Sequence, residues 1–268
     1  MNKLIIESAA SVGKIIVAVV LLFFTYLIFF QTDIWGVLFG LALLIFVTLP
    51  TIFVVYFKRK YLENHPEFIK KWKFLRVIYV IILFLFVLML GFGVYRAVQK
   101  DKTVKAVEFI NSKKITLDDV MGKNLPPQPD QGLNDSTIAG IDANKNYIRD
   151  DVELAIFKKY PDSAKIRAAE LQYAQALQLE LTQVFNSETL VTVMRQENRG
   201  IDCIGKTGPE PSLQGLKLIN DRKSEVEELN LNTDLRKKSE LDNLKKYMTG
   251  YSSLPGNECD LNLVELDN

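Results

Sequence analysis

Oxygen-bearing side chains recur at a regular spacing between Asp142 and Glu153, where the sequence reads DANKNYIRDDVE. Counted from Asp142, they stand at positions 1, 3, 5, 9 and 12 of a twelve-residue loop, and the residue at position 7 would offer its backbone carbonyl. The predicted ligands are Asp142, Asn144, Asn146, Ile148, Asp150 and Glu153. Ca²⁺ takes six to eight oxygen ligands, so this spacing predicts a loop that curls around a calcium ion.

Two features of this loop lower the expected affinity. Position 6 requires a positive φ and is occupied by Tyr147, which costs about 1 kcal/mol. Lys145 and Arg149 carry positive charge, which opposes a cation. We therefore expect a dissociation constant of ~10⁻⁴ to 10⁻³ M and a structural role for the ion. The alternative is a cation-free turn in which Asp150 and Asp151 cap the following helix.

Cys203 and Cys259 are the only cysteines of the chain. An even number of cysteines in a domain outside the cytoplasm predicts a disulfide. The bond would close a loop of about 55 residues and contribute at most about 4 kcal/mol through loop entropy. If the domain faced the cytoplasm, two buried free thiols would be the alternative.

The segment Gly200 to Thr207, GIDCIGKT, matches the phosphate-loop pattern GxxxxGK[ST]. That loop requires a buried strand before the first glycine and a helix that begins at the Lys-Thr pair. Here the polar segment RQENR precedes the pattern, and Gly208 and Pro209 follow it. We therefore expect no nucleotide ligand.

Signatures of enzymes are missing from the sequence. There is no GxSxG, HExxH or CxxC motif, and His65 is the only histidine, so no Ser-His or Cys-His couple can form. Glu170, Glu180 and Glu197 are expected to lie on solvated helix faces, with no two of them paired as acid and base. The sequence therefore predicts a protein that is not an enzyme.

The elements that position these residues belong to two different parts of the chain. Charge and hydropathy change at about residue 95, where the first part ends. Met1 to Tyr95 contains 9 basic and 4 acidic residues together with the long apolar runs, whereas the rest contains 24 basic and 28 acidic residues. This division excludes a single soluble domain, a disordered chain and a strongly basic nucleic-acid binder. We expect no nucleic acid among the partners.

Three apolar runs predict transmembrane helices at about residues 12–31, 34–57 and 77–95, so the lipid bilayer is an expected partner. With the N-terminus in the cytoplasm, nine Lys and Arg residues lie on the inner side and four on the outer side. The positive-inside rule therefore places the C-terminal region outside the cytoplasm. We expect a multi-pass protein of the bacterial inner membrane with a periplasmic or extracellular domain.

The rest of the chain is predicted to be all-α. Residues 96–133 are expected to form a juxtamembrane segment and a Pro-rich linker, and residues 134–268 a helical domain. Apolar spacing and capping residues predict five helices. They begin at Asp150, near Ser163, near Thr189 and after Ser212, and the last has Leu241, Leu244, Met248 and Tyr251 on its apolar face.

The loop at Asp142 resembles the calcium loops of EF-hands, dockerins and thrombospondin type 3 repeats. Over a wider range, Leu125 to Leu261 resembles an uncharacterised family of bacterial exported proteins. These share a GxDxNxNGxRDDVE loop, a cysteine in mid-domain and a terminal Cys-Asp. The family resemblance implies a similar fold and export; Tyr147 and the three-helix anchor are departures from its pattern.

These observations predict a membrane-anchored, extracytoplasmic binding or accessory protein. Its partner would be another protein of the envelope, as for an immunity or assembly factor. The alternative is an integral-membrane subunit of a transport or secretion complex, in which Gly36 and Gly40 would let another helix approach closely.

Overall fold

The computed structural model describes residues 66–209, 212–250 and 258–267. All regular elements in these ranges are helices, which confirms the all-α class. The chain divides into two units, Met1–Asp101 and Lys102–Asn268, each treated by itself below. The elements are α3 (Pro66–Ser112), α4 (Leu117–Val120), α5 (Gln131–Asp135), α6 (Asp150–Lys159), α7 (Ala164–Gln183), α8 (Ser187–Lys206), α9 (Leu213–Asn230), α10 (Asp234–Tyr247) and the 3₁₀ turn η1 (Leu263–Glu265).

The first unit contains the predicted membrane spans. The spans at 12–31 and 34–57 lie outside the described residues. The third, 77–95, falls within α3, where many of the side chains also lie outside the description. Among the described residues, no helix has both the length and the hydropathy needed to cross a membrane.

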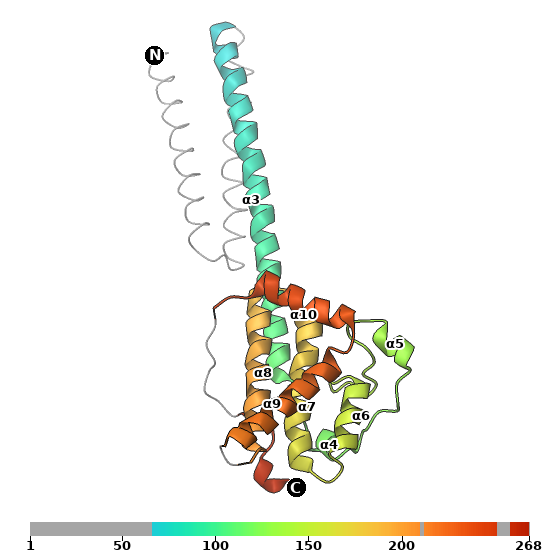
Figure 1. Cartoon of the computed structure of the whole chain (residues 1–268). Coiled ribbons are helices and arrows are strands. Elements are labelled where there is room, and N and C mark those ends of the chain that lie inside the picture. The colour runs from blue at the N-terminus through green and yellow to red at the C-terminus, as the bar shows by residue number, and fades with distance from the viewer. Residues whose placement is uncertain (1–65, 210–211, 251–257, 268) are drawn as a thin grey trace. The chain divides into compact units, whose positions relative to one another are not determined.

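The second unit is built around α7. The three residues that connect α7 to α8 turn the chain back, so the two helices form an antiparallel hairpin (Figure 1). Helices α4, α6, α9 and α10 also pack against α7. Consequently every side chain of α7 from Arg167 to Leu181 is buried, and its polar residues lie inside the domain together with the apolar ones.

Local signals in the sequence explain where these helices begin. Ser163 caps α7, because its side chain accepts a hydrogen bond from the Ile166 N–H, and Ser212 caps α9 in the same way through the Gly215 N–H. These side chains satisfy backbone donors that have no partner in the first turn of a helix. Both predicted starting points are confirmed.

The compact unit begins earlier than the sequence indicates. The end of α3 belongs to it, since Ile110 is fully buried and packs with Leu179 of α7 and Val193 of α8. Ile115 and Val120 lie in the main core. Residues expected to form a juxtamembrane segment and linker therefore contribute to the hydrophobic core of the domain.

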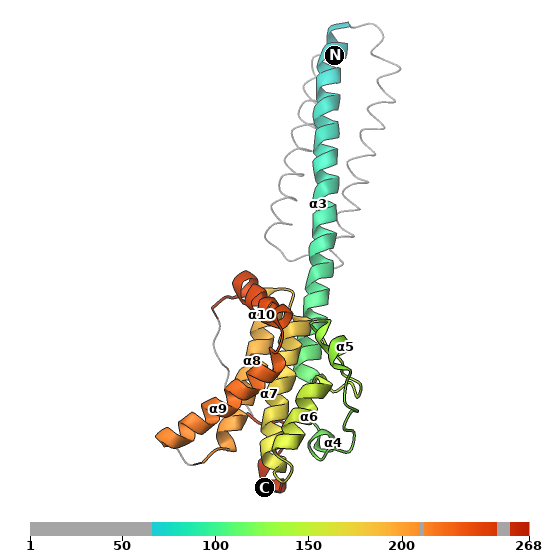
Figure 2. The same ribbon diagram turned by 45° about the vertical axis from the view of Figure 1, so that its right-hand side comes forward.

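Helix α10 buries few of its side chains. It lies across one end of the α7–α8 hairpin (Figures 1 and 2), and its only buried residue is Arg236. Leu241 and Met248 are 48% and 51% exposed. The prediction that these two residues lie on a buried apolar face is therefore wrong. Tyr251, which was expected on the same face, lies outside the described residues.

Candidate functional site

The segment from Gly140 to Glu153 forms a curled loop that leads into α6. Lys145 and Tyr147 adopt positive φ values of 61° and 63°. Their conformation turns backbone N–H groups inward, where the carboxylate of Asp142 accepts hydrogen bonds from Asn146 N at 3.2 Å and from Tyr147 N at 3.0 Å. The loop pattern requires a positive φ at Tyr147, and the backbone has one.

Packing of the Tyr147 side chain compensates for the cost of this backbone conformation. The ring lies edge-on to Phe109 of α3, with 5.2 Å between the ring centroids, and the Lys113 ammonium lies 4.1 Å from its centroid. Gln175 of α7 donates a hydrogen bond to the Asn146 carbonyl at 2.7 Å. Tyr147, which stands where the loop pattern has glycine, therefore attaches the loop to α3, and Gln175 attaches it to α7.

Two further carboxylates close the loop from its C-terminal side. Asp150 accepts a hydrogen bond from Ala143 N at 2.9 Å, and Glu153 accepts one from the Asn144 side-chain amide at 3.0 Å. Both residues are buried. Burial, helped by the nearby charges of Asp119 and Asp150, raises the pKa of Glu153 to about 7, and burial also raises the pKa values of Asp142 and Asp150.

The loop offers oxygen atoms, which are the ligands that calcium prefers. Its acidic side chains alone do not form a metal site. Within the described part of the chain, no group of three or more His, Cys, Asp or Glu side chains is arranged to hold a metal ion. Ile148 is fully buried, and its N–H donates to the Asn146 side-chain oxygen at 2.9 Å. A cation here would depend on amide and carbonyl oxygens together with carboxylates, a mixed set that Ca²⁺ accepts.

Arg149 is directed away from the loop interior, contrary to the expectation that its charge opposes a cation there. Its guanidinium is fully buried and donates to the carbonyls of Leu229 at 2.6 Å and Asn230 at 3.0 Å, at the end of α9. It also forms an ion pair with Asp151. The partial negative charge at a helix C-terminus favours a cation, so Arg149 fixes the loop to α9.

A second buried guanidinium holds the segment before the loop. Arg236 of α10 donates to the carbonyls of Asn134 at 2.5 Å and of Thr137 and Ile138 at 3.1 Å. The buried side chain of Asn134 in turn accepts a hydrogen bond from Ile141 N at 2.9 Å. Sequence reasoning missed these residues, because nothing in the local pattern distinguishes them from solvent-exposed polar residues.

Gly140 is required where these two networks meet. Its φ is +67°, and an added Cβ would lie 2.3 Å from Arg149 Cδ and 2.8 Å from the side-chain oxygen of Asn134. Real atoms do not approach so closely, so any side chain here would displace the buried arginine.

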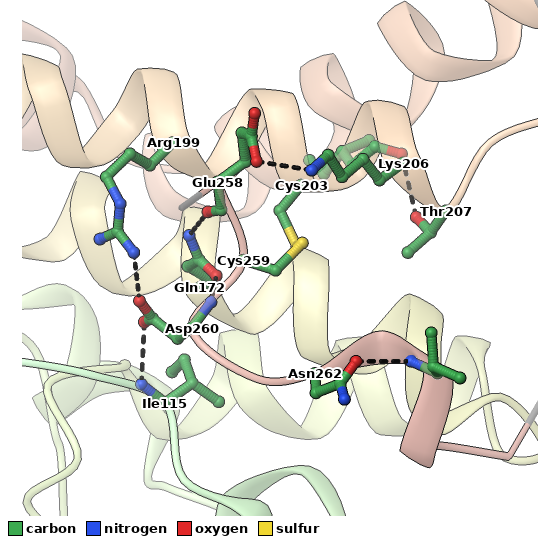
Figure 3. Close-up of a disulfide and its surroundings, with 12 residues drawn as sticks. Ile115, Gln172, Arg199, Cys203, Lys206, Thr207, Glu258, Cys259, Asp260 and Asn262 are labelled. Carbon is green, nitrogen blue, oxygen red and sulfur yellow. Dashed lines mark hydrogen bonds and ion pairs between the residues drawn. A yellow bond between two sulfur atoms is a disulfide. The ribbon is translucent and has the colours of Figure 1, made fainter. Parts of the chain in front are cut away.

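The disulfide between Cys203 and Cys259 is confirmed, with an S–S distance of 2.07 Å and a Cα–Cα distance of 4.9 Å. It joins α8 to the C-terminal segment (Figure 3). The adjacent Asp260 carboxylate binds Arg199 at 2.6 Å and Lys114 at 3.0 Å, and it accepts a hydrogen bond from Ile115 N at 3.1 Å. The Cys-Asp pair therefore attaches the end of the domain both to α8 and to the segment that follows α3.

The phosphate-loop match lies within α8 and at its end. The backbone of Gly200 through Lys206 is helical, and Thr207 is the C-cap. Lys206 forms an ion pair with Glu258 at 2.5 Å (Figure 3). A Cβ on Gly200 would lie 2.8 Å from the Tyr173 Cα. The glycine is therefore explained by the close approach of α7 and α8.

The expectation of solvated glutamates is wrong for Glu170 and Glu180, which are 3% and 4% exposed. Glu170 forms a buried ion pair with Arg222 of α9 at 2.8 Å. Glu180 lies beside Glu197 of α8, close enough for the two carboxyl groups to share a hydrogen bond when one of them is protonated. The apolar spacing of α7 predicts which positions face its partners, but a helix covered on most sides buries its polar positions too.

No protein-family model, curated protein or solved structure was found to match this chain. The structure itself offers three features: a curled loop lined with oxygen atoms, a pair of buried carboxyl groups, and a helical domain whose C-terminal segment is joined to α8 by a disulfide.

Proposed function

We propose that the chain is a membrane-anchored binding or accessory protein of the bacterial envelope, with its helical domain outside the cytoplasm. The observation that carries this proposal is the disulfide between α8 and the C-terminal segment. Disulfides persist in oxidising compartments and are rare in the cytosol. The apolar runs of the first 95 residues, the positive-inside count and the resemblance of Leu125 to Leu261 to bacterial exported proteins support the same location.

A binding role agrees with the surface of the domain. Leu213 and Leu216 stand one turn apart on α9 and are 89% and 56% exposed. Apolar side chains at such spacing on one helix are suited to contact with another protein. The partner would be another envelope protein, as for an immunity or assembly factor.

Cysteine labelling tests the location. We expect that Leu213→Cys, made in the otherwise native chain, reacts with a membrane-impermeant maleimide in spheroplasts, because both native cysteines are bonded to each other. The matched variant Glu63→Cys lies in the predicted cytoplasmic segment and should react only after lysis. The reverse pattern would place the domain in the cytoplasm and refute the proposal. Co-purification from detergent tests the binding role, and a chain that remains a lone monomer under several conditions contradicts it.

The loop at Asp142 is part of the proposal as a weak structural calcium site. Its curled backbone, its three carboxylates and the positive φ of Tyr147 support the assignment. The ion would be held by Asp142, Asn144, Asn146, Ile148, Asp150 and Glu153, and its effect would be to fix the start of α6. An ion of this kind stabilises the folded chain only when its concentration approaches the dissociation constant.

Calorimetric titration of the chelator-treated chain in detergent should show one Ca²⁺ bound with a dissociation constant of ~10⁻⁴ to 10⁻³ M. Asp142→Asn should abolish the binding, whereas Asp162→Asn, at an exposed carboxylate outside the loop, should leave it unchanged. Absence of binding at about 10 mM Ca²⁺ would assign the loop to a cation-free turn. Equal binding by both variants would exclude this site.

A further inference from the structure

Four glutamates from four different helices lie near enough to one another to interact electrostatically. Glu180 of α7 and Glu197 of α8 face each other, and Glu240 of α10 and Glu227 of α9 lie near them. Two other ionisable groups face the cluster. Tyr173 of α7 donates its hydroxyl to Glu227 at 2.6 Å, and Lys223 of α9 binds the same carboxylate at 2.7 Å.

The central pair lacks hydrogen-bond partners for two of its oxygens. Within the described residues, one buried oxygen of Glu180 and one of Glu197 have no donor. Lys223 and Tyr173 are both directed at Glu227 instead. Two ionised carboxylates cannot hydrogen-bond to each other, whereas a single proton between them supplies the missing donor. The geometry is therefore complete only when the pair holds a proton.

Helix α10 closes over this pair with little apolar support. It contributes Glu240 to the cluster, and the side-chain amide of Asn243 donates to the backbone carbonyl of Glu180 at 3.2 Å. Its single buried side chain, Arg236, is engaged with the segment from Asn134 to Ile138. Arg236 anchors the start of the helix, whereas residues 237–247 contribute no buried side chain. Elements that bury few apolar side chains open at low cost, so electrostatic repulsion beneath residues 237–247 is enough to release this part of α10.

We propose that Glu180 and Glu197 bind a proton that serves as a latch: while the proton is present, residues 237–247 of α10 stay docked on the α7–α8 hairpin, and its loss releases them. The ligand of this site is the proton, and Arg236 stays in place as the anchor of the helix. The latch acts within the domain itself, independently of the location and partner proposed above.

The direction of the pH dependence follows from burial. Desolvation and the charge of Glu240 raise the pKa of Glu180 to about 7, and burial beside Glu180 raises the pKa of Glu197 well above its ordinary value. Burial together with Glu227 raises the pKa of Glu240. A carboxyl whose pKa is raised in the closed form stabilises that form at low pH. This stabilisation is lost as the pH rises from the ordinary glutamate value of 4.5 through about 7 and beyond.

Hydrogen exchange of the full chain in detergent tests the latch. After correction for the intrinsic pH dependence of exchange, amides of residues 237–247 should exchange about tenfold faster at about pH 8.5 than at about pH 5.5, while α7 stays protected. In the double variant Glu180→Gln, Glu197→Gln, α10 should remain protected at both pH values, since the two glutamine side chains cannot ionise. The matched control Glu228→Gln, at an exposed position of α9, should behave like the native chain.

The single variant Glu240→Gln provides a second measurement should the double variant fail to fold. Removing the charge that α10 brings to the pair lowers the pKa of Glu180, so less stabilisation is lost as the pH rises and the acceleration of α10 exchange at about pH 8.5 should be smaller than in the native chain. The proposal is overturned if α10 exchange in the native chain is independent of pH, if α7 and α10 lose protection together, or if neither the double variant nor Glu240→Gln reduces the acceleration.

Discussion

Replacing Arg236 with methionine is expected to lower the free energy of unfolding of the domain by about 3–5 kcal/mol, the cost typical of breaking a buried ion pair. The guanidinium is fully buried and donates to three backbone carbonyls between Asn134 and Ile138, as well as to Asp135. Methionine keeps most of the volume but leaves the buried Asn134 carbonyl, and the partly buried hydrogen bonds to Thr137 and Ile138, without their donor. Each unpaired buried carbonyl costs about 1–3 kcal/mol, which is consistent with that total.

Pulse proteolysis of the full chain in increasing urea measures this change. The midpoint of cleavage should move to lower urea, and the segment that precedes the loop should be cut first. Lys237→Met is the matched control, because Lys237 is the exposed neighbour on the same helix and its removal should change the midpoint little. A midpoint in Arg236→Met equal to that of the control would contradict a structural role for the buried guanidinium.

Loss of the disulfide should have an effect of similar size. Replacing Cys203 and Cys259 together by alanine is expected to cost about 4 kcal/mol, because the bond constrains an unfolded loop whose ends are 56 positions apart. The double variant avoids leaving a reactive thiol at either position. The segment from Glu258 onward should become the first site of proteolysis, since the bond joins it to α8.

Reductant supplies the control for this experiment. Adding dithiothreitol to the native chain should reproduce the loss in stability, whereas adding it to the double variant should change nothing further. An unfolding midpoint that is unaffected by both treatments would mean that the ion pairs of Asp260 and Lys206 hold the C-terminal segment without the bond.

Local chemistry made the helices predictable. Ser163 and Ser212 begin helices for a reason that is visible within three residues of each, and Pro161 follows Tyr160, the C-cap of α6. The curled loop was predictable for the same reason, since the spacing of Asp142 and its neighbours fixes where backbone N–H groups must point. The all-α class and the disulfide pairing follow from signals of this kind.

Contacts between distant segments were not predictable from the sequence. Arg149 and Arg236 have the local context of solvent-exposed residues, and they become buried only because α9 and α10 return to the loop. Glu180 was misjudged because helical periodicity assigns a polar position to solvent, whereas α7 is covered by several neighbouring helices. For α10 the opposite error occurred, since its apolar spacing suggested a buried face on which Leu241 and Met248 are in fact exposed.

The attachment of the last segment also determines the order in which the domain can fold. Asp260 bonds to a backbone N–H 145 positions earlier in the chain, and Leu266 completes the main core. The α7–α8 hairpin needs only neighbouring residues and is able to form as soon as both helices have been synthesised. The core closes only after Leu266 emerges, so a chain delivered stepwise from its N-terminus holds an incomplete core until that residue has been added.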